Sequence, residues 1–366
     1  MLIFSLPFTM KQVSGILLSF CYTAIFVPVI FITGESFSQN SPFIFHHIST
    51  LDGLPSANVN SILQDKNGYI WVATNDGLQK YDGYTFQSFH HDPLNEQSLS
   101  SDILYSLLED DQNNIWSISF LAGFNKFNTL TARNLRLNDL DNALSKDFFR
   151  STGLCKDKDG NIWLIGTENI ARYDVRSSKI EFIKDKFPAT LHPYFIAAQL
   201  DASKNQLWLA DLNQGVCMYD LAEKVFYCHD YNPKKLSVFD LDFRPMRLYL
   251  DKEKNLWVIG NEISLAKYDP ESGLSVTYQL YASPNYSIVN VKKKSAPKGY
   301  KPVSISAMLE DSRHQLWLGS GSLGLMEYQR EKDSFMVVSS ENNMAIIFIL
   351  IPLSIVFQKT GMDLSG

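Results

Sequence analysis

Six tryptophans recur at one position of a repeated segment, and this regularity constrains the fold more than any other feature. The protein has six Trp in 366 residues, and neighbouring ones lie 45, 47, 45, 49 and 60 residues apart. A nearly fixed period of this size is typical of propellers and related repeat architectures. The tryptophans are Trp71, Trp116, Trp163, Trp208, Trp257 and Trp317.

Two further positions recur around each Trp. An Asp stands six residues before it in five copies, and in the fourth copy Asp201 is displaced by one. Asp at the start of a turn accepts hydrogen bonds from the following backbone N–H groups, and a glycine such as Gly68 adopts positive φ there. We therefore expect Asp65 to shape a turn and Trp71 to fill the space between sheets, with no catalytic role for either. An aromatic residue follows each Trp after ten or eleven positions, at Tyr81, Phe127, Tyr173, Tyr219, Tyr268 and Tyr328.

Each copy predicts four short strands. In the first copy these are Val59 to Gln64, Tyr69 to Thr74, Leu78 to Tyr81 and Thr85 to Phe89, separated by turn residues. The second strand is apolar at consecutive positions, so both faces of its sheet must be covered. Four-stranded sheets that cover one another in this way are the blades of a β-propeller, an all-β fold. A β-solenoid is the alternative, although its repeats are usually shorter. An insertion, roughly Leu274 to Pro302, lengthens the last interval.

The unit resembles the two-component regulator propeller repeat. Its first copy, ILQDKNGYIWVATNDGLQKYD, carries the Asp, Gly, apolar-Trp-apolar, Gly-Leu and Tyr-Asp of that pattern, and the resemblance covers residues 43 to 335. It implies the periplasmic sensor region of a hybrid histidine kinase, in a family where many sensors recognise carbohydrate breakdown products. Family propellers generally have seven blades, whereas six copies stand here, so closure with six or seven blades stays open. A strand at Phe43 to Ile48 is expected to pair with the last blade.

The two ends of the chain differ from the repeats. Residues 1–38 resemble a signal peptide, because Lys11 precedes an apolar run that ends before Ser36 and Ser38. The alternative is an uncleaved N-terminal anchor, the one case in which we expect a membrane partner. Residues 39–340 form the predicted sensor domain, exported to the periplasm. Residues 341–366 are an atypical apolar tail, whose run from Met344 to Phe357 is short for a bilayer span. This tail favours a truncated or frame-disrupted product of a longer sensor gene, with a short anchor as the rival.

Two classes of function remain. The net charge is −6 with no basic block, which disfavours nucleic acid as a partner. No kinase motif is present, so we expect no kinase activity from this chain; such activity would belong to C-terminal domains of a full-length relative. The first class is a non-catalytic sensor of a small molecule or oligosaccharide, with a homodimer through the sensor domain left open. The second is a carbohydrate-active propeller enzyme, a sialidase-like hydrolase or a lyase. Against a sialidase, the arginines do not occupy matching positions in separate blades, for example Arg172, Arg176, Arg244 and Arg247.

Several short motifs invite a site but favour structural roles. Gly319-x-Gly321-x-x-Gly324 matches a dinucleotide fingerprint, yet a strand pattern follows it instead of a helix, so we expect a turn. His46-His47 and His90-His91-Asp92 could suggest a metal, but adjacent side chains of an extended chain point apart. We expect no catalytic residue, metal or cofactor, and the sequence assigns no ligand-binding residue.

The cysteines predict one structural pair. Cys217 and Cys228 flank a short turn and could face each other across a hairpin, and export permits a disulfide there. Cys155 stands where other copies mostly carry Leu, so we expect a small buried apolar residue.

Overall fold

The computed structural model describes residues 48–338, with gaps at 141–143, 145–147, 149, 184–186, 188–191, 262–263, 285–286 and 291–296. The chain divides into a unit Met1–Asn40 and a unit Ser41–Gly366, and every described residue belongs to the second. The predicted signal peptide, the strand expected at Phe43 to Ile48 except its last residue, the pair His46-His47 and the apolar tail lie outside the described residues. Among the described residues, no helix has the length and apolarity needed to cross a bilayer.

Six antiparallel sheets follow one another along the chain, and in each the strands pair in sequence order. Blade 1 contains β1 (Val59–Gln64), β2 (Ile70–Thr74), β3 (Leu78–Tyr81) and β4 (Phe86–Phe89). Blade 2 contains β5 (Leu104–Glu109), β6 (Asn114–Ser119), β7 (Gly123–Asn128) and β8 (Arg133–Arg136). Blade 3 contains β9 (Ser151–Lys156), β10 (Ile162–Gly166), β11 (Ile170–Asp174) and β12 (Lys179–Phe182).

The second half repeats this order. Blade 4 contains β13 (Phe195–Asp201), β14 (Gln206–Asp211), β15 (Gly215–Asp220) and β16 (Val225–Tyr227). Blade 5 contains β17 (Pro245–Leu250), β18 (Leu256–Gly260), β19 (Ser264–Asp269) and β20 (Leu274–Ala282). Blade 6 contains β23 (Ile305–Glu310), β24 (Leu316–Ser320), β25 (Gly324–Gln329) and β26 (Ser334–Val337). Short 3₁₀ helices stand at η1 (Thr50–Asp52), η2 (Leu137–Asp139), η4 (Ser237–Asp240) and η5 (Arg330–Lys332).

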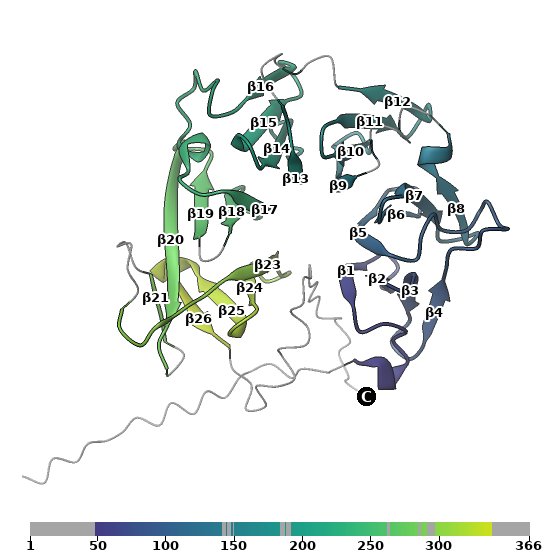
Figure 1. The fold of residues 1–366 in the computed structure, drawn as a ribbon, viewed down its shortest axis with the longest axis horizontal. Coiled ribbons are helices and arrows are strands. Elements are labelled where there is room, and N and C mark those ends of the chain that lie inside the picture. Colours follow the sequence, from purple (N-terminus) through teal and green to yellow (C-terminus); the bar gives the residue numbers. More distant parts are fainter. Residues whose placement is uncertain are drawn as a thin grey trace, which may run out of the picture. The chain divides into compact units, whose positions relative to one another are not determined.

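The sheets are arranged as the blades of a propeller, with the first strand of each nearest a common centre and the fourth outermost (Figure 1). This confirms the predicted all-β class and the six four-stranded blades. The insertion of the last interval belongs to blade 5, where β21 (Ile288–Asn290) and β22 (Lys301–Pro302) both pair with the long strand β20. The predicted strands of the first copy agree with β1 to β4 to within one residue.

The recurring aromatics hold neighbouring blades together. Each of the first five tryptophans contacts the recurring aromatic of the next blade, and the recurring aromatics of these five pairs are all buried. Hydrophobic clusters join the same consecutive blades. The predicted role of Trp71 as a filler between sheets is therefore confirmed. The pairs, with their centroid distances, are Trp71–Phe127 (5.7 Å), Trp116–Tyr173 (5.0 Å), Trp163–Tyr219 (6.4 Å), Trp208–Tyr268 (5.6 Å) and Trp257–Tyr328 (4.9 Å).

The recurring Asp closes the turn between the first two strands. In blade 1, Asp65 Oδ1 accepts hydrogen bonds from the backbone N–H groups of Asn67 (2.9 Å) and Tyr69 (3.0 Å). Gly68 in this turn has φ +90°, a conformation that L side chains rarely adopt. The predicted turn chemistry is confirmed.

Candidate functional site

The two histidines of the His90-His91-Asp92 motif have different surroundings. His90 Nδ1 lies 3.6 Å from a carboxylate oxygen of Asp76 and 3.6 Å from one of Asp102. His91 Nδ1 lies 2.6 Å from the carbonyl oxygen of Leu99. The rings therefore serve two separate sets of neighbours, as expected for adjacent residues in extended chain.

The glycine motif and the arginines are also placed by the blades. Gly321 lies in the tight turn between β24 and β25, and Gly324 begins β25 with φ +73°, which confirms the predicted turn. Arg172 in β11 forms an ion pair of 3.4 Å with Asp157 in its own blade. Arg176 follows the same strand, whereas Arg244 and Arg247 stand at the start of blade 5. The four arginines come from two blades only, and Arg172 is engaged in a structural pair.

The three cysteines that the structure describes are buried. Cys155, Cys217 and Cys228 lie in one hydrophobic cluster between blades 3 and 4. Burial raises the pKa of Cys155 to about 12, as expected for an inert apolar residue. A hydrogen bond shared with Cys228 raises the pKa of Cys217 and lowers that of Cys228. The disulfide between Cys217 and Cys228 stays a prediction.

The two ends of each blade carry different loops. The turn between the second and third strands lies at the same end as the connection that leads from the outer strand to the next blade. We call this end the connection face; the Asp turns lie at the opposite end. Binding residues concentrate on loops held by a rigid scaffold, so the connection face, which carries the longer segments between blades, is the end at which a ligand site is expected.

All six inner strands are irregular where they leave the connection face. Their pairing register shifts by one residue near the first positions of the strand, which marks a β-bulge. Bulges redirect side chains and are over-represented next to functional sites. The residues at the shifts are Asn60, the pair Tyr105-Ser106, Thr152, Ile196, Met246 and Ser306.

An exposed aromatic pair occupies the connection face of blade 2. Tyr105 at the bulge of β5 is 42% exposed, and Phe120 in the turn after β6 is 46% exposed. Their rings meet edge to face with centroids 6.0 Å apart. Leu121 beside Phe120 is 41% exposed and has φ +50°, an uncommon conformation for a residue with a large side chain. Strained residues of this kind cluster at ligand-binding positions.

Neighbouring residues fix this pair in place. Asn60, the bulge residue of blade 1, donates a hydrogen bond of 2.8 Å from Nδ2 to the carbonyl oxygen of Leu104, directly before Tyr105. The backbone N–H of Phe120 donates to the carbonyl oxygen of Ile103 at 2.9 Å. The pair therefore stands on a braced backbone and presents a rigid apolar surface. Such a surface can stack on a flat apolar ligand face, with polar groups at its edge setting orientation.

Arg247 supplies a cation at the same end of blade 5. Its side chain is exposed to solvent, yet surrounding protein desolvates it and lowers its pKa. Met246, the bulge residue before it, is 44% exposed. The connection face thus combines aromatic, aliphatic and cationic side chains from different blades.

Comparison with known proteins identifies the repeat. Residues 53–76 match the two component regulator propeller family. This match covers one copy of the repeat, in blade 1. A segment of 63 residues is 44% identical to histidine kinase P4 of Formosa agariphila, and it covers 17% of this chain and 5% of the kinase.

Solved structures share the propeller fold. An extracellular domain described as that of a hybrid two component system of B. thetaiotaomicron aligns with a TM-score of 0.61 and 20% identity, over 82% of this chain and 38% of that one. A second extracellular domain from this organism, described as that of a one component system, aligns at 0.58 with 20% identity, over 82% and 36%. PorZ, a surface component of the type-IX secretion system of Porphyromonas gingivalis, aligns at 0.58 with 12% identity, over 82% and 44%. The chain spans less than half the length of these proteins.

The sixfold repeat explains which residues the sequence could and could not assign. The recurring Trp, Asp and aromatic positions all serve the scaffold, whereas Tyr105 and Phe120 were not predicted. A signal for them exists: the turn after the second strand reads Asn75-Asp76 in the first copy but Phe120-Leu121 in the second. The corresponding pair is polar in the first copy, so packing within a blade does not require apolar residues at this position.

Proposed function

We propose that this chain is the ligand-sensing, extracytoplasmic propeller of a two-component signalling system and that its ligand is a carbohydrate. The repeat family and the shared fold with extracellular domains support the first part. In this proposal the propeller binds and does not catalyse, and kinase chemistry belongs to separate domains; the matched segment is 5% of a protein described as a histidine kinase.

The exposed pair Tyr105–Phe120 carries the second part of the proposal. Pyranose rings have an apolar C–H face that packs on aromatic rings, while their hydroxyls need polar partners at the rim. Tyr105 offers both a ring and a hydroxyl, and Phe120 enlarges the platform. The connection face is the end at which a ligand would meet several blades at once, so binding there could alter how the blades sit together.

A thermal-shift and calorimetric screen against neutral oligosaccharides tests this proposal. We expect one saccharide class to stabilise the protein, by about 2.7 kcal/mol when present at a hundred times its Kd, with no product formed over hours. Tyr105→Ala should weaken that binding by at least about tenfold, equivalent to 1.4 kcal/mol. Tyr84→Ala is the matched control, because Tyr84 is 89% exposed in a turn at the opposite end of blade 1. Absence of binding to any saccharide would refute the proposal, and steady conversion of a saccharide would favour the hydrolase or lyase alternative.

A further inference from the structure

A groove runs along the outer strand of blade 2. Its volume is about 870 Å³, within the range of small-molecule sites. Its lining residues come from β8, from the segment around Glu96 and Gln97, which we call its wall, and from Asp139 and Leu140 after β8. We call this the outer groove. None of its lining residues belongs to the aromatic pair of the connection face.

Arg136 holds the wall of the outer groove in place. Its guanidinium donates to the carbonyl oxygens of Ser98 (3.0 Å) and Asn95 (2.9 Å) and to the hydroxyl oxygen of Ser98 (2.7 Å). It also donates to the carbonyl oxygen of Asp92 at 3.3 Å. These acceptors are all neutral, so the positive charge of Arg136 is not cancelled by a carboxylate contact, and the wall is formed before any ligand binds.

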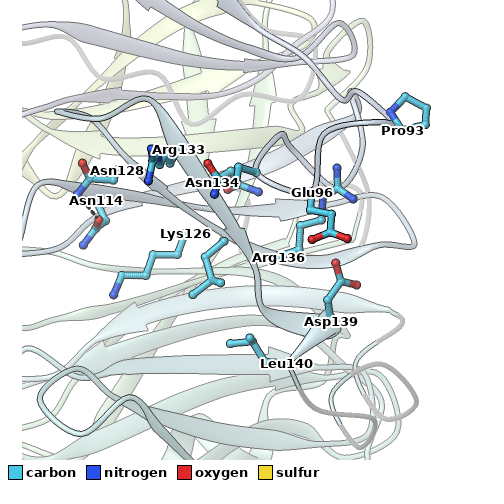
Figure 2. Close-up of a pocket in the computed structure, with 12 residues that line it drawn as sticks. Pro93, Glu96, Asn114, Lys126, Asn128, Arg133, Asn134, Arg136, Asp139 and Leu140 are labelled. Atoms are coloured by element: carbon cyan, nitrogen blue, oxygen red, sulfur yellow. Dashed lines mark hydrogen bonds between the residues drawn. The ribbon is translucent and has the colours of Figure 1, made fainter.

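One end of the outer groove gathers cations and amides. Lys126, Arg133, Asn114 and Asn128 lie together there (Figure 2). The Lys126 ammonium lies 5.5 Å from the ring centroid of Trp116 and 5.2 Å from that of Tyr173, which restrains it without neutralising it.

Arg133 and the amides complete this cationic end. The Arg133 side chain is exposed and forms no ion pair with any residue that the structure describes. Asn128 Nδ2 donates to Asn114 Oδ1 at 3.0 Å, so the two amides are oriented by each other. The end therefore presents two unneutralised charges next to fixed polar groups.

Asp110, which bonds Asn114 of this end, is already satisfied. Asp110 is 2% exposed and accepts hydrogen bonds of 2.8 Å from Asn114 Nδ2 and from Trp116 Nε1. Its other oxygen accepts from the backbone N–H of Gln112 at 2.8 Å. These donors offset its charge, and it is not exposed to a ligand in the outer groove.

The other end of the outer groove offers acceptors instead. Glu96 and Asp139 lie there with Arg136 (Figure 2). Between the two ends, Asn134 is 5% exposed and its Oδ1 has no hydrogen-bond partner among the described residues. A buried acceptor without a partner is costly unless a donor reaches it, and a ligand hydroxyl in the groove would be such a donor.

We propose that the outer groove binds an acidic oligosaccharide, with a carboxylate or sulfate at Lys126 and Arg133 and hydroxyls at Asn134, Glu96 and Asp139. Guanidinium groups recognise planar or tetrahedral oxyanions through paired N–H donors, which a neutral sugar cannot exploit. The proposal rests on the proposed function in one respect, that the ligand is a saccharide. It adds a second binding site to the proposed function and specifies that the saccharide bound there is negatively charged.

Calorimetry on the purified protein tests the outer groove with three probes of equal length: an oligogalacturonate, a sulfated oligosaccharide and a neutral oligosaccharide. We expect one of the two acidic probes to bind at least about tenfold more tightly than the neutral one. Arg133→Glu should weaken that binding by at least about tenfold. Arg133→Lys should weaken it by less, because lysine keeps the positive charge but lacks the paired N–H donors of the guanidinium group. Raising the salt concentration should weaken it too, since both cations are reached by solvent.

Lys179→Glu is the matched control. Lys179 begins β12 at the register position that Arg133 holds in β8, opposite Asp174 as Arg133 is opposite Asn128, and it is likewise exposed. Binding of the acidic probe should be unchanged in this variant. The inference is overturned when neither acidic probe outbinds the neutral one, or when Arg133→Glu and Lys179→Glu weaken binding equally. Binding of neutral probes that depends on Tyr105 would, in those cases, leave the proposed function standing.

Discussion

The indole Nε1 of Trp116 donates a hydrogen bond of 2.8 Å to the buried carboxylate of Asp110. The same bond recurs in blades 1, 3, 5 and 6 at 2.8, 3.2, 3.0 and 3.2 Å. Each Asp thereby joins its turn to the Trp of its own blade, and in blades 1, 2, 3 and 5 that Trp packs on the aromatic of the next blade. Blade 4 is the exception: Asp201 stands one residue further from Trp208, and no described residue accepts a bond from that indole.

This difference gives a paired test of the indole bond. Trp116→Phe and Trp208→Phe both remove apolar area, but only the first removes a donor from a buried carboxylate, whose Oδ2 then keeps only the hydrogen bond from Asn114 Nδ2. We expect Trp116→Phe to lower the free energy of unfolding by about 1–3 kcal/mol more than Trp208→Phe. Urea denaturation followed by circular dichroism measures both. Equal losses would show that the bond contributes no stability.

Arg330 joins blades 5 and 6 through three carboxylates. Its Nη1 lies 3.3 Å from Asp251 and 2.7 Å from Glu253, and its Nη2 lies 3.1 Å from Glu310. The Asp251 and Glu310 side chains are fully buried. Arg330→Ala would leave two buried carboxylates without a compensating positive charge. It should therefore lower the free energy of unfolding by about 3 kcal/mol.

An exposed ion pair is the control for Arg330. Lys204 and Glu271 lie 2.7 Å apart across blades 4 and 5, and Glu271 is 83% exposed. Glu271→Ala should cost less than about 1 kcal/mol, because solvent screens such pairs. Both variants can be compared by chemical denaturation at low and high salt. A salt-sensitive, small effect for Arg330→Ala would contradict the role given to it.

Repetition made the scaffold residues predictable from the sequence. The candidate ligand sites could not be predicted in the same way, because their residues do not repeat. The positions of Trp71, Asp65 and Tyr81 are occupied by similar residues in every copy, at nearly equal spacing. Their structural roles could therefore be inferred from this recurrence. The indole–carboxylate bond was not predicted, since a separation of six residues shows nearness only once the hairpin turn between them is known. Its absence in blade 4 nevertheless follows from the displacement of Asp201, which the sequence displays.

The sites depend on residues that do not recur. Tyr105 is exposed because of a bulge, and a bulge is a register shift that hydrophobic alternation does not reveal. The outer groove needs Arg136 to fix a segment about forty positions earlier in the chain. Contacts of that range come from tertiary packing, so a single sequence gives no periodic signal for them.

Buried tyrosines predict a loss of stability in alkali. Burial raises the pKa of Tyr249 and of Tyr268 to about 12, from an ordinary value of 10. The folded state thus holds these phenols neutral, a contribution that is complete below pH 10 and is lost as the pH rises from 10 to 12. Urea midpoints should stay level up to about pH 10 and then fall as the pH approaches 11.5. In Tyr268→Phe the fall should be shallower, since one such phenol is gone; an identical slope would contradict the assignment.

Cys217 and Cys228 should form a disulfide under oxidation. The register pairs Met218 with Tyr227 and Tyr219 with Phe226, so the next pair outward is Cys217 and Cys228. Diamide would take two electrons and two protons from the thiols and join the sulfurs. In a Cys21→Ser background, thiol titration after denaturation should fall from three groups to one, the remaining one being Cys155. Three free thiols after diamide treatment would exclude the bond.

The Trp–aromatic contacts between consecutive blades, which we call the ladder, differ on the two faces of blade 1. Phe127 in blade 2 is 2% exposed and contacts Trp71 and Phe89. Tyr81 holds the same position in blade 1 but is only partly buried, and its ring contact within the described residues is Phe86 of its own blade, at 4.5 Å. The stability that the recurring aromatic supplies should therefore depend on whether a Trp of the preceding blade covers it.

Alanine substitution at these two positions measures that dependence. Phe127→Ala should lower the free energy of unfolding by about 3–5 kcal/mol, because it opens a cavity between packed blades. Tyr81→Ala should cost roughly half as much, since the ring is partly solvated before it is removed. Equal losses would mean that Tyr81 is packed in solution as tightly as Phe127, and the ladder would then extend to blade 1. A difference would show that coverage by the preceding Trp, and not the aromatic itself, provides most of the stability between blades.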